Sequence, residues 1–143
     1  MNITCETLNE NIKILLVGVI FILGGCGDAT IENLKGKTWC VIEVVVNGEN
    51  IDPEIEEFPF KLNGCTHNLR IRESGIADLP SFGGVCYMAK WTEKDGIIVF
   101  SMVDKFKDLQ DSNNHFIDEF RIEVEKDILT LKNNKKTIRC QLN

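Results

Sequence analysis

The chain has 143 residues, the size of one ordinary domain. With 43% hydrophobic and 27% charged residues, its composition is that of a globular protein and excludes a disordered chain or an integral membrane protein. The formal net charge is -6 and no basic run is longer than Lys135-Lys136, so we expect no nucleic-acid partner. Net acidity of this kind serves solubility in most proteins.

The first recognisable segment is an apolar run from Ile14 to Leu23. A membrane-spanning helix needs about 20 such residues, whereas a shorter run is typical of the apolar region of an export signal. Gly24 and Gly25 follow, and then Cys26. Small residues directly before a cysteine resemble the lipobox of bacterial lipoproteins, in which that cysteine receives lipid on its sulfur and becomes the new N-terminus.

This resemblance implies that residues 1–25 are a signal peptide, that Cys26 is the lipidation site and that residues 26–34 are a lipidated tether. The chain would then be an anchored protein of the bacterial cell envelope, because acyl chains contribute about 0.8 kcal/mol per methylene buried in the membrane. The only basic residue before the apolar run is Lys13, fewer than an export signal usually carries. A buried strand that ends in a Gly-Gly turn is the alternative interpretation.

The next residues alternate short apolar strands with turn residues. Thr38–Val46 (TWCVIEVVV) is rich in β-branched and aromatic residues and ends at Asn47-Gly48, a strong signal for a type I′ hairpin turn. Further short strands are predicted at residues 58–62 and 67–72. Residues 74–84 contain glycines, serines and a proline, which predict a loop or lid.

The second half of the chain follows the same pattern. Residues 85–91 alternate strictly, so that Tyr87 and Trp91 share one face, and Asp95-Gly96 turns the chain into the next strand. Residues 104–115 are polar and predict the longest irregular connection. The strands predicted in this half are 85–91, 97–103, 116–125, 128–132 and 136–142.

About eight short strands, mostly joined by tight turns, predict an all-β domain over residues 35–143, folded as a single antiparallel up-and-down β-barrel. Closure removes exposed strand edges, so we expect a monomer. A barrel of this size is either filled by side chains or just wide enough for one small ligand. The modest number of large aromatic residues favours a mostly filled interior.

Four cysteines, Cys40, Cys65, Cys86 and Cys140, remain in the expected mature domain. An even number in a small exported domain indicates disulfides, and four cysteines allow three pairings. Because a closed barrel makes its first and last strands neighbours, we predict Cys40–Cys140 together with Cys65–Cys86. The alternatives are four buried free thiols, or a zinc site at Cys65 and His67, for which no second paired motif follows at finger spacing.

Two resemblances bear on the family. The run 34–39 (LKGKTW) resembles the Gly-x-Trp start of lipocalin-like bacterial lipoproteins, with one additional residue between Gly36 and Trp39, and residues 91–100 and 120–131 resemble later hairpins of that family. This resemblance spans residues 34–142 and implies an up-and-down barrel whose interior holds a small apolar ligand.

The runs 63–68 (NGCTHN) and 86–89 (CYMA) resemble a second family, the META-type (heat-shock lipoprotein-like) envelope domain, which we rank second. Neither resemblance transfers a catalytic residue. For the lipocalin-like reading, the residues predicted to line a ligand cavity are Trp39, Tyr87, Trp91 and Phe120. The alternative is that they belong to an ordinary core.

No set of residues forms a recognised catalytic constellation. His67 is expected at the core or the rim of the barrel without a nucleophile beside it, and His115 is expected to be solvated in a polar loop. Glu54, Glu56 and Glu57 are expected to form a solvated acidic face. We therefore predict that the protein is not an enzyme and has neither a metal nor a cofactor.

Two functions agree with these features. The first is a non-enzymatic lipoprotein that binds a small apolar ligand at one barrel mouth, gated by residues 74–84 or 104–115, because long connections concentrate function. The alternative is a protein-interaction module, such as an inhibitor or immunity protein, whose acidic surface meets a cationic envelope or secreted partner.

Overall fold

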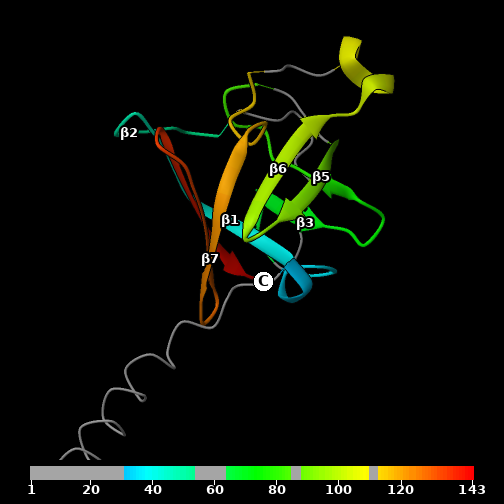
Figure 1. Cartoon of the computed structure of the whole chain (residues 1–143). Helices are drawn as coiled ribbons and strands as arrows, with labels where there is room; N and C mark the ends of the chain where they lie inside the picture. The colour runs from blue at the N-terminus through cyan, green and yellow to red at the C-terminus, as the bar shows by residue number, and fades with distance from the viewer. Residues whose placement is uncertain (1–30, 54–63, 85–87, 110–112) are drawn as a thin grey trace, which may run out of the picture.

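The computed structural model describes residues 31–53, 64–84, 88–109 and 113–143. In this part of the chain, nine strands form one antiparallel sheet; β1 pairs with both β3 and β9, which closes eight of them into a barrel and leaves β2 beside β1 (Figure 1). The strands are β1 (Thr38–Val46), β2 (Glu49–Asn50), β3 (Asn68–Ile71), β4 (Ile76–Asp78), β5 (Met88–Lys94), β6 (Ile97–Met102), β7 (Glu119–Glu125), β8 (Ile128–Lys132) and β9 (Lys136–Leu142). The predicted all-β class and the single up-and-down barrel are confirmed.

The first and last strands are neighbours, as a closed barrel requires. Trp39 lies opposite Leu142 at one end of the β1–β9 ladder, and Val46 lies opposite Lys136 at the other. β1 is rich in β-branched and apolar residues, and β9 alternates apolar with polar residues; both patterns suit a half-buried sheet.

A β-bulge interrupts this ladder. The register shifts between Val41 and Glu43, so Ile42 is the extra residue on β1. Before the bulge Trp39 and Val41 are buried, and after it the next buried residue is Val44. The bulge therefore changes which alternate residues of β1 face the interior, and it leaves the Ile42 side chain 50% exposed.

Tight turns between consecutive strands form where the sequence predicts them. Asn47 and Gly48 both have positive φ, 52° and 85°, as the two central residues of a type I′ turn require. Asp95 and Gly96 repeat this geometry between β5 and β6, with φ of 54° and 77°. Lys126 has φ of 55° in the tight turn from β7 to β8.

Some predicted boundaries were wrong. Residues 76–78 form strand β4 inside the segment expected to be a loop, because the glycine and proline on either side limit this strand to three residues. The polar connection after β6 begins with a 3-10 helix, η2 (Asp104–Leu109). The predicted strand 58–62 and the acidic residues Glu54, Glu56 and Glu57 lie outside the described residues.

The interior of the barrel is filled by side chains. Inward positions of most strands, together with Phe116 of the connection before β7, carry large apolar residues that are almost completely inaccessible; among the largest are Trp39, Phe100, Phe116, Phe120, Leu69, Ile71, Ile98, Leu129, Leu131 and Ile138. A hollow that admitted water would leave accessible surface on the side chains around it, yet each of these is less than 2% exposed. Among the described residues, the filled alternative for an eight-stranded barrel therefore holds.

One end of the barrel is plugged by the first described residues. Leu34, just after η1 (Ile31–Asn33), is fully buried, and Ile31 is 8% exposed. Gly36 then donates its N–H to the carbonyl of Ile71, which fixes the segment against the end of β3. We assigned residues up to 34 to the tether, but Ile31 and Leu34 belong to the core of the domain.

Candidate functional site

The two ends of the barrel differ in the connections they carry. The turns at 72–75, 95–96 and 126–127 lie at the same end as η1 and are short. The opposite end carries the three long connections, residues 51–67, 79–87 and 103–118, of which only part is described (Figure 1). Long connections can shape a concave surface and tight turns cannot, so a binding site is expected at this second end, the mouth of the barrel.

A buried asparagine joins two of the long connections across the mouth. Asn114 is 1% exposed, and its amide nitrogen donates to the carbonyls of Pro80 and Gly84 at 2.9 and 2.8 Å. Its amide oxygen accepts the N–H of Phe116 at 2.9 Å. The rings of Phe82 and Phe116 pack 6.1 Å apart beneath these bonds. The two connections therefore act as one cover over the barrel.

Both histidines of the chain lie in contact with this cover. The ring of His67 meets the ring of Phe82 edge-on at 5.5 Å. His115 packs against Gly83, where a Cβ would lie 2.5 Å from Nε2, so no larger residue fits. Burial lowers the pKa of His115, and the positive charge of Lys136 lowers it further. His115 is therefore partly buried, and the expectation of a solvated histidine was wrong.

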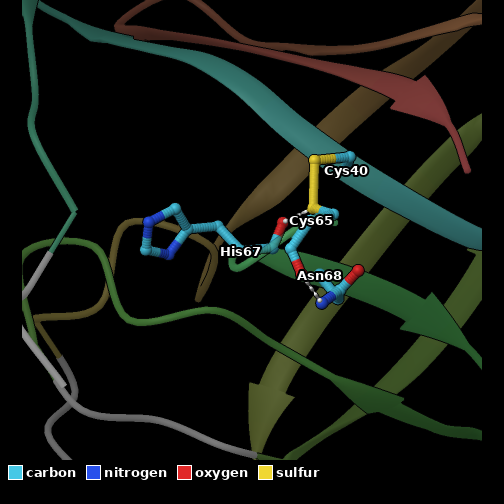
Figure 2. The surroundings of a disulfide bond; sticks show 4 residues. All are labelled: Cys40, Cys65, His67 and Asn68. Carbon is cyan, nitrogen blue, oxygen red and sulfur yellow. Dashed lines mark hydrogen bonds between the residues drawn. A yellow bond between two sulfur atoms is a disulfide. The ribbon is translucent and has the colours of Figure 1, made fainter. Parts of the chain in front are cut away.

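A disulfide lies close to His67, where β1 meets the segment before β3. Cys40 of β1 is bonded to Cys65, with 5.7 Å between their Cα atoms (Figure 2). Asn68 donates its side-chain N–H to the carbonyl of Cys65 at 3.1 Å, and the backbone N–H of Val41 donates to the carbonyl of His67 at 2.9 Å. The segment 64–67 is thus joined to β1 by the disulfide and by the hydrogen bond from Val41, and to the start of β3 by the hydrogen bond from Asn68.

The predicted pairing of the cysteines was wrong. Cys40 lies opposite Gln141, whereas Cys140 lies opposite Val41, one position away on the same two strands. Because side chains alternate between the faces of a sheet, Cys140 points into the core while Cys40 points out. Cys140 is a buried free thiol, and burial raises its pKa. Cys86 lies outside the described residues.

The disulfide also removes the thiolate that the zinc interpretation needs at Cys65. Within the described part of the chain, no three His, Cys, Asp or Glu side chains gather closely enough to hold a metal ion.

A groove with both apolar and polar lining residues opens beside the cover. It has a volume of about 360 Å³, within the usual range for small-molecule sites, and we call it the mouth groove. Val41 and Val44 form its buried floor, and Ile51, His67 and Phe82 form its walls. Its remaining described lining residues are Ile42, Glu43, Asn50, Asp52 and Pro53.

The groove exists because two partners of β1 diverge. The first three residues of β1 pair with β3, and the last two pair with β2 on the same side. Between them, only single hydrogen bonds reach β1 from the described residues: Val41 donates to His67, and Val44 accepts from Ile51 at 2.8 Å. The bulge at Ile42 adds its exposed side chain to the rim of this opening.

A second, larger hollow of about 540 Å³ lies on the outer wall, beside the β7–β8 turn. Its lining is mostly charged or polar, including Glu123, Glu125, Asp127 and Arg139. It contains no aromatic side chain and no fully buried floor. The mouth groove is smaller, but Val41 and Val44 give it a buried apolar floor and Phe82 gives it an aromatic wall, which the hollow on the outer wall lacks.

Of the residues predicted to line a cavity, the three that the structure describes do not lie together around one. Trp39 and Phe120 are 1% and 0% exposed in the packed interior. Trp91 lies at the other end of the barrel, where its indole N–H donates to the carbonyl of Arg72 and the Lys35 ammonium lies 5.7 Å from its ring. Tyr87 lies outside the described residues.

The sequence pointed to part of the groove. Residues 74–84 were expected to gate a mouth, and Phe82 of that segment does form a wall. Val41, Val44 and Ile51 were not singled out, because their contribution depends on the bulge and on the divergence of β2 from β3. Glu43, the one charged residue in an apolar run, is the only sequence signal that β1 is irregular at this point.

The chain matches no family model, no curated protein and no solved structure in the comparisons made. Among the described residues, no helix has the length and apolar character needed to cross a bilayer.

Proposed function

We propose that this chain is a membrane-anchored lipoprotein of the bacterial cell envelope, whose lipocalin-like barrel binds a small apolar ligand without catalysing a reaction. The single observation that supports binding is the mouth groove. Its floor is apolar, its walls combine Ile51 and Phe82 with the imidazole of His67, and the disulfide and the buried Asn114 fix the segments around it. A largely pre-formed apolar concavity with a few polar groups is the usual form of a small-molecule site.

Because the interior is filled, the proposed binding site lies outside the core and away from the barrel axis. A ligand held inside would need space among Trp39, Phe100 and Phe120, whose side chains are no more than 1% exposed. The mouth groove needs no rearrangement of these residues. The proposed binding mode is therefore shallow, and we expect a compact ligand rather than a fully enclosed one.

The position of the first described residue supports the anchor. Ile31 lies at the tight-turn end, five positions after Cys26. Five residues span at most about 18 Å when fully extended. A lipid on Cys26 would therefore hold the tight-turn end close to the membrane and leave the mouth groove facing away from it.

Lipidation at Cys26 is tested by metabolic labelling. Cells that make the native chain and are supplied with an alkyne-bearing fatty acid should yield a labelled protein in the membrane fraction. Cys26→Ser should lose both the label and the membrane association, because the sulfur that accepts the acyl chain is absent. Cys140→Ser, which changes a buried thiol, should keep both. A labelled Cys26→Ser chain, or an unlabelled native chain, would contradict the anchor.

Binding in the groove is tested with an environment-sensitive apolar dye and the chain from residue 27 to 143, which contains every described element and carries no lipid. Ile51→Glu places a charge on the wall of the groove, and we expect dye affinity to fall by about tenfold or more, because an apolar ligand cannot solvate a buried carboxylate. Titration of dye fluorescence measures this change.

Ile97→Glu is the matched control for that experiment. Ile97 is a partly exposed isoleucine on the outer face of β6, opposite Arg121, so the new carboxylate is accommodated. This variant should bind dye as the native chain does, and both variants should melt cooperatively. Equal dye affinity for Ile51→Glu and the native chain would exclude the groove as the binding site.

A further inference from the structure

The mouth groove has a charge pattern in addition to its apolar lining. Two carboxylates, Glu43 and Asp52, lie among its described lining residues, and none of those residues is a lysine or an arginine. The only other polar side chains there are Asn50 and His67. The lining thus combines an apolar floor with an acidic rim.

The two carboxylates differ in their surroundings. Glu43 lies 3.5 Å from Arg139 of the neighbouring strand β9, and both side chains are about half exposed, at 40% and 47%. Asp52 follows β2, is exposed, and forms no ion pair or hydrogen bond within the described part of the chain. Among the described residues, Asp52 is therefore the lining carboxylate without an ion-pair partner, and it is the one we assign to a charge on a ligand.

The arrangement fits a molecule with two parts. An apolar body would cover Ile42 and Ile51, the accessible apolar side chains of the lining, and a positive group at its end would reach the rim beside Asp52. A negative group in the same place would face two carboxylates of its own sign, of which only Glu43 has a cationic partner, Arg139, among the described residues. The net charge of the chain, -6, acts in the same direction by attracting cations to the surface.

We propose, on the basis of the function proposed above, that the ligand of the mouth groove is a small amphiphile with an apolar body and a protonated amine. Asp52 pairs with the amine at the rim, and Ile42 and Ile51 receive the body. Specificity then comes from charge at the rim, since these apolar side chains offer only a shape and an apolar surface.

The test compares three probes that share one alkyl chain: decylamine, decanol and decanoate, each below its aggregation limit, with the chain from residue 27 to 143. Displacement of the apolar dye at low salt gives the three affinities. We expect decylamine to bind up to about fivefold more tightly than decanol, the usual size for an exposed ion pair, and decanoate to bind most weakly. High salt should remove most of the advantage of the amine.

Asp52→Asn identifies the residue responsible. It should abolish the advantage of decylamine and leave the affinity for decanol unchanged. Asp127→Asn, which neutralises an exposed aspartate at the opposite end of the barrel, is the matched control and should keep the advantage.

The possible outcomes separate the two proposals. If decylamine and decanol bind the native chain equally, or decanoate binds most tightly, the amine inference is overturned while the groove remains a ligand site. If none of the three probes binds, the proposed function fails, and the amine inference fails with it. If Asp52→Asn keeps the full advantage of decylamine, the assignment of the amine to this rim is wrong.

Discussion

Phe120→Ala should lower the free energy of unfolding by about 3–5 kcal/mol, the usual cost of removing a buried aromatic side chain. Phe120 is completely buried, its ring packs 6.4 Å from the ring of Phe100, and it lies opposite Ile98 of the neighbouring strand. Neighbours in a closed barrel can collapse only partly into the space, so most of the cavity remains. Urea unfolding of the native chain and the variant measures the difference.

The same variant reports on whether the interior is filled. A new apolar cavity in Phe120→Ala should bind benzene or xenon, which the native interior should exclude. Ile97→Ala, on the outer face of the adjacent strand, is the control and should cost about 1 kcal/mol or less without creating such binding. Benzene bound inside the native barrel would show that the packing described here is wrong.

Removal of the disulfide should have the second large effect. The bond joins residues separated by 25 positions, and the chain-entropy model assigns about 3–4 kcal/mol to a loop of this length. Cys40→Ala with Cys65→Ala should therefore lower the free energy of unfolding by that amount, and a reductant should lower the native value similarly. Denaturant unfolding with and without dithiothreitol measures both.

Cys140→Ala separates this effect from the simple loss of a sulfur atom. It removes a buried thiol that is not bonded to another cysteine, so a modest cost is expected, and its stability should remain sensitive to reductant. If Cys140→Ala abolishes the sensitivity to reductant and the Cys40 and Cys65 variants do not, the disulfide has been assigned to the wrong residues.

The correct pairing was partly readable from the sequence. Trp39 and Val41 are the apolar residues that alternate along the first half of β1, so Cys40 between them belongs on the outer face. Cys140 alternates in phase with the apolar residues Ile138 and Leu142, so it belongs on the inner face. Two cysteines on opposite faces of neighbouring strands cannot bond. That the partner of Cys40 is Cys65 does not follow from alternation, because it depends on how residues 64–67 approach β1.

Strand positions were predictable where turn residues with a characteristic sequence mark the ends of the strands. Asn47-Gly48, Asp95-Gly96 and the corner at Lys126 fixed their hairpins, because positive φ is accessible there at low cost. β4 was missed because a strand of three residues is too short to produce an alternation that can be distinguished from a loop.

The mouth groove was the least predictable feature. Its lining comes from β1, from the residues after β2, from His67 and from Phe82, which are brought together only by closure of the barrel. The bulge at Ile42 decides which residues of β1 reach it, and a single extra residue in an apolar run leaves little trace in sequence. The prediction relied on aromatic residues and therefore placed the cavity in the interior, where Trp39 and Phe120 are in fact packed.

The most direct test of binding at the mouth is a chemical-shift map of backbone amides during titration with decylamine. Binding in the groove predicts the largest changes at Val44, Ile51 and Phe82. Changes centred instead on interior residues such as Phe120 and Leu131, with the mouth unaffected, would place the ligand inside the barrel and contradict a filled core with an external site.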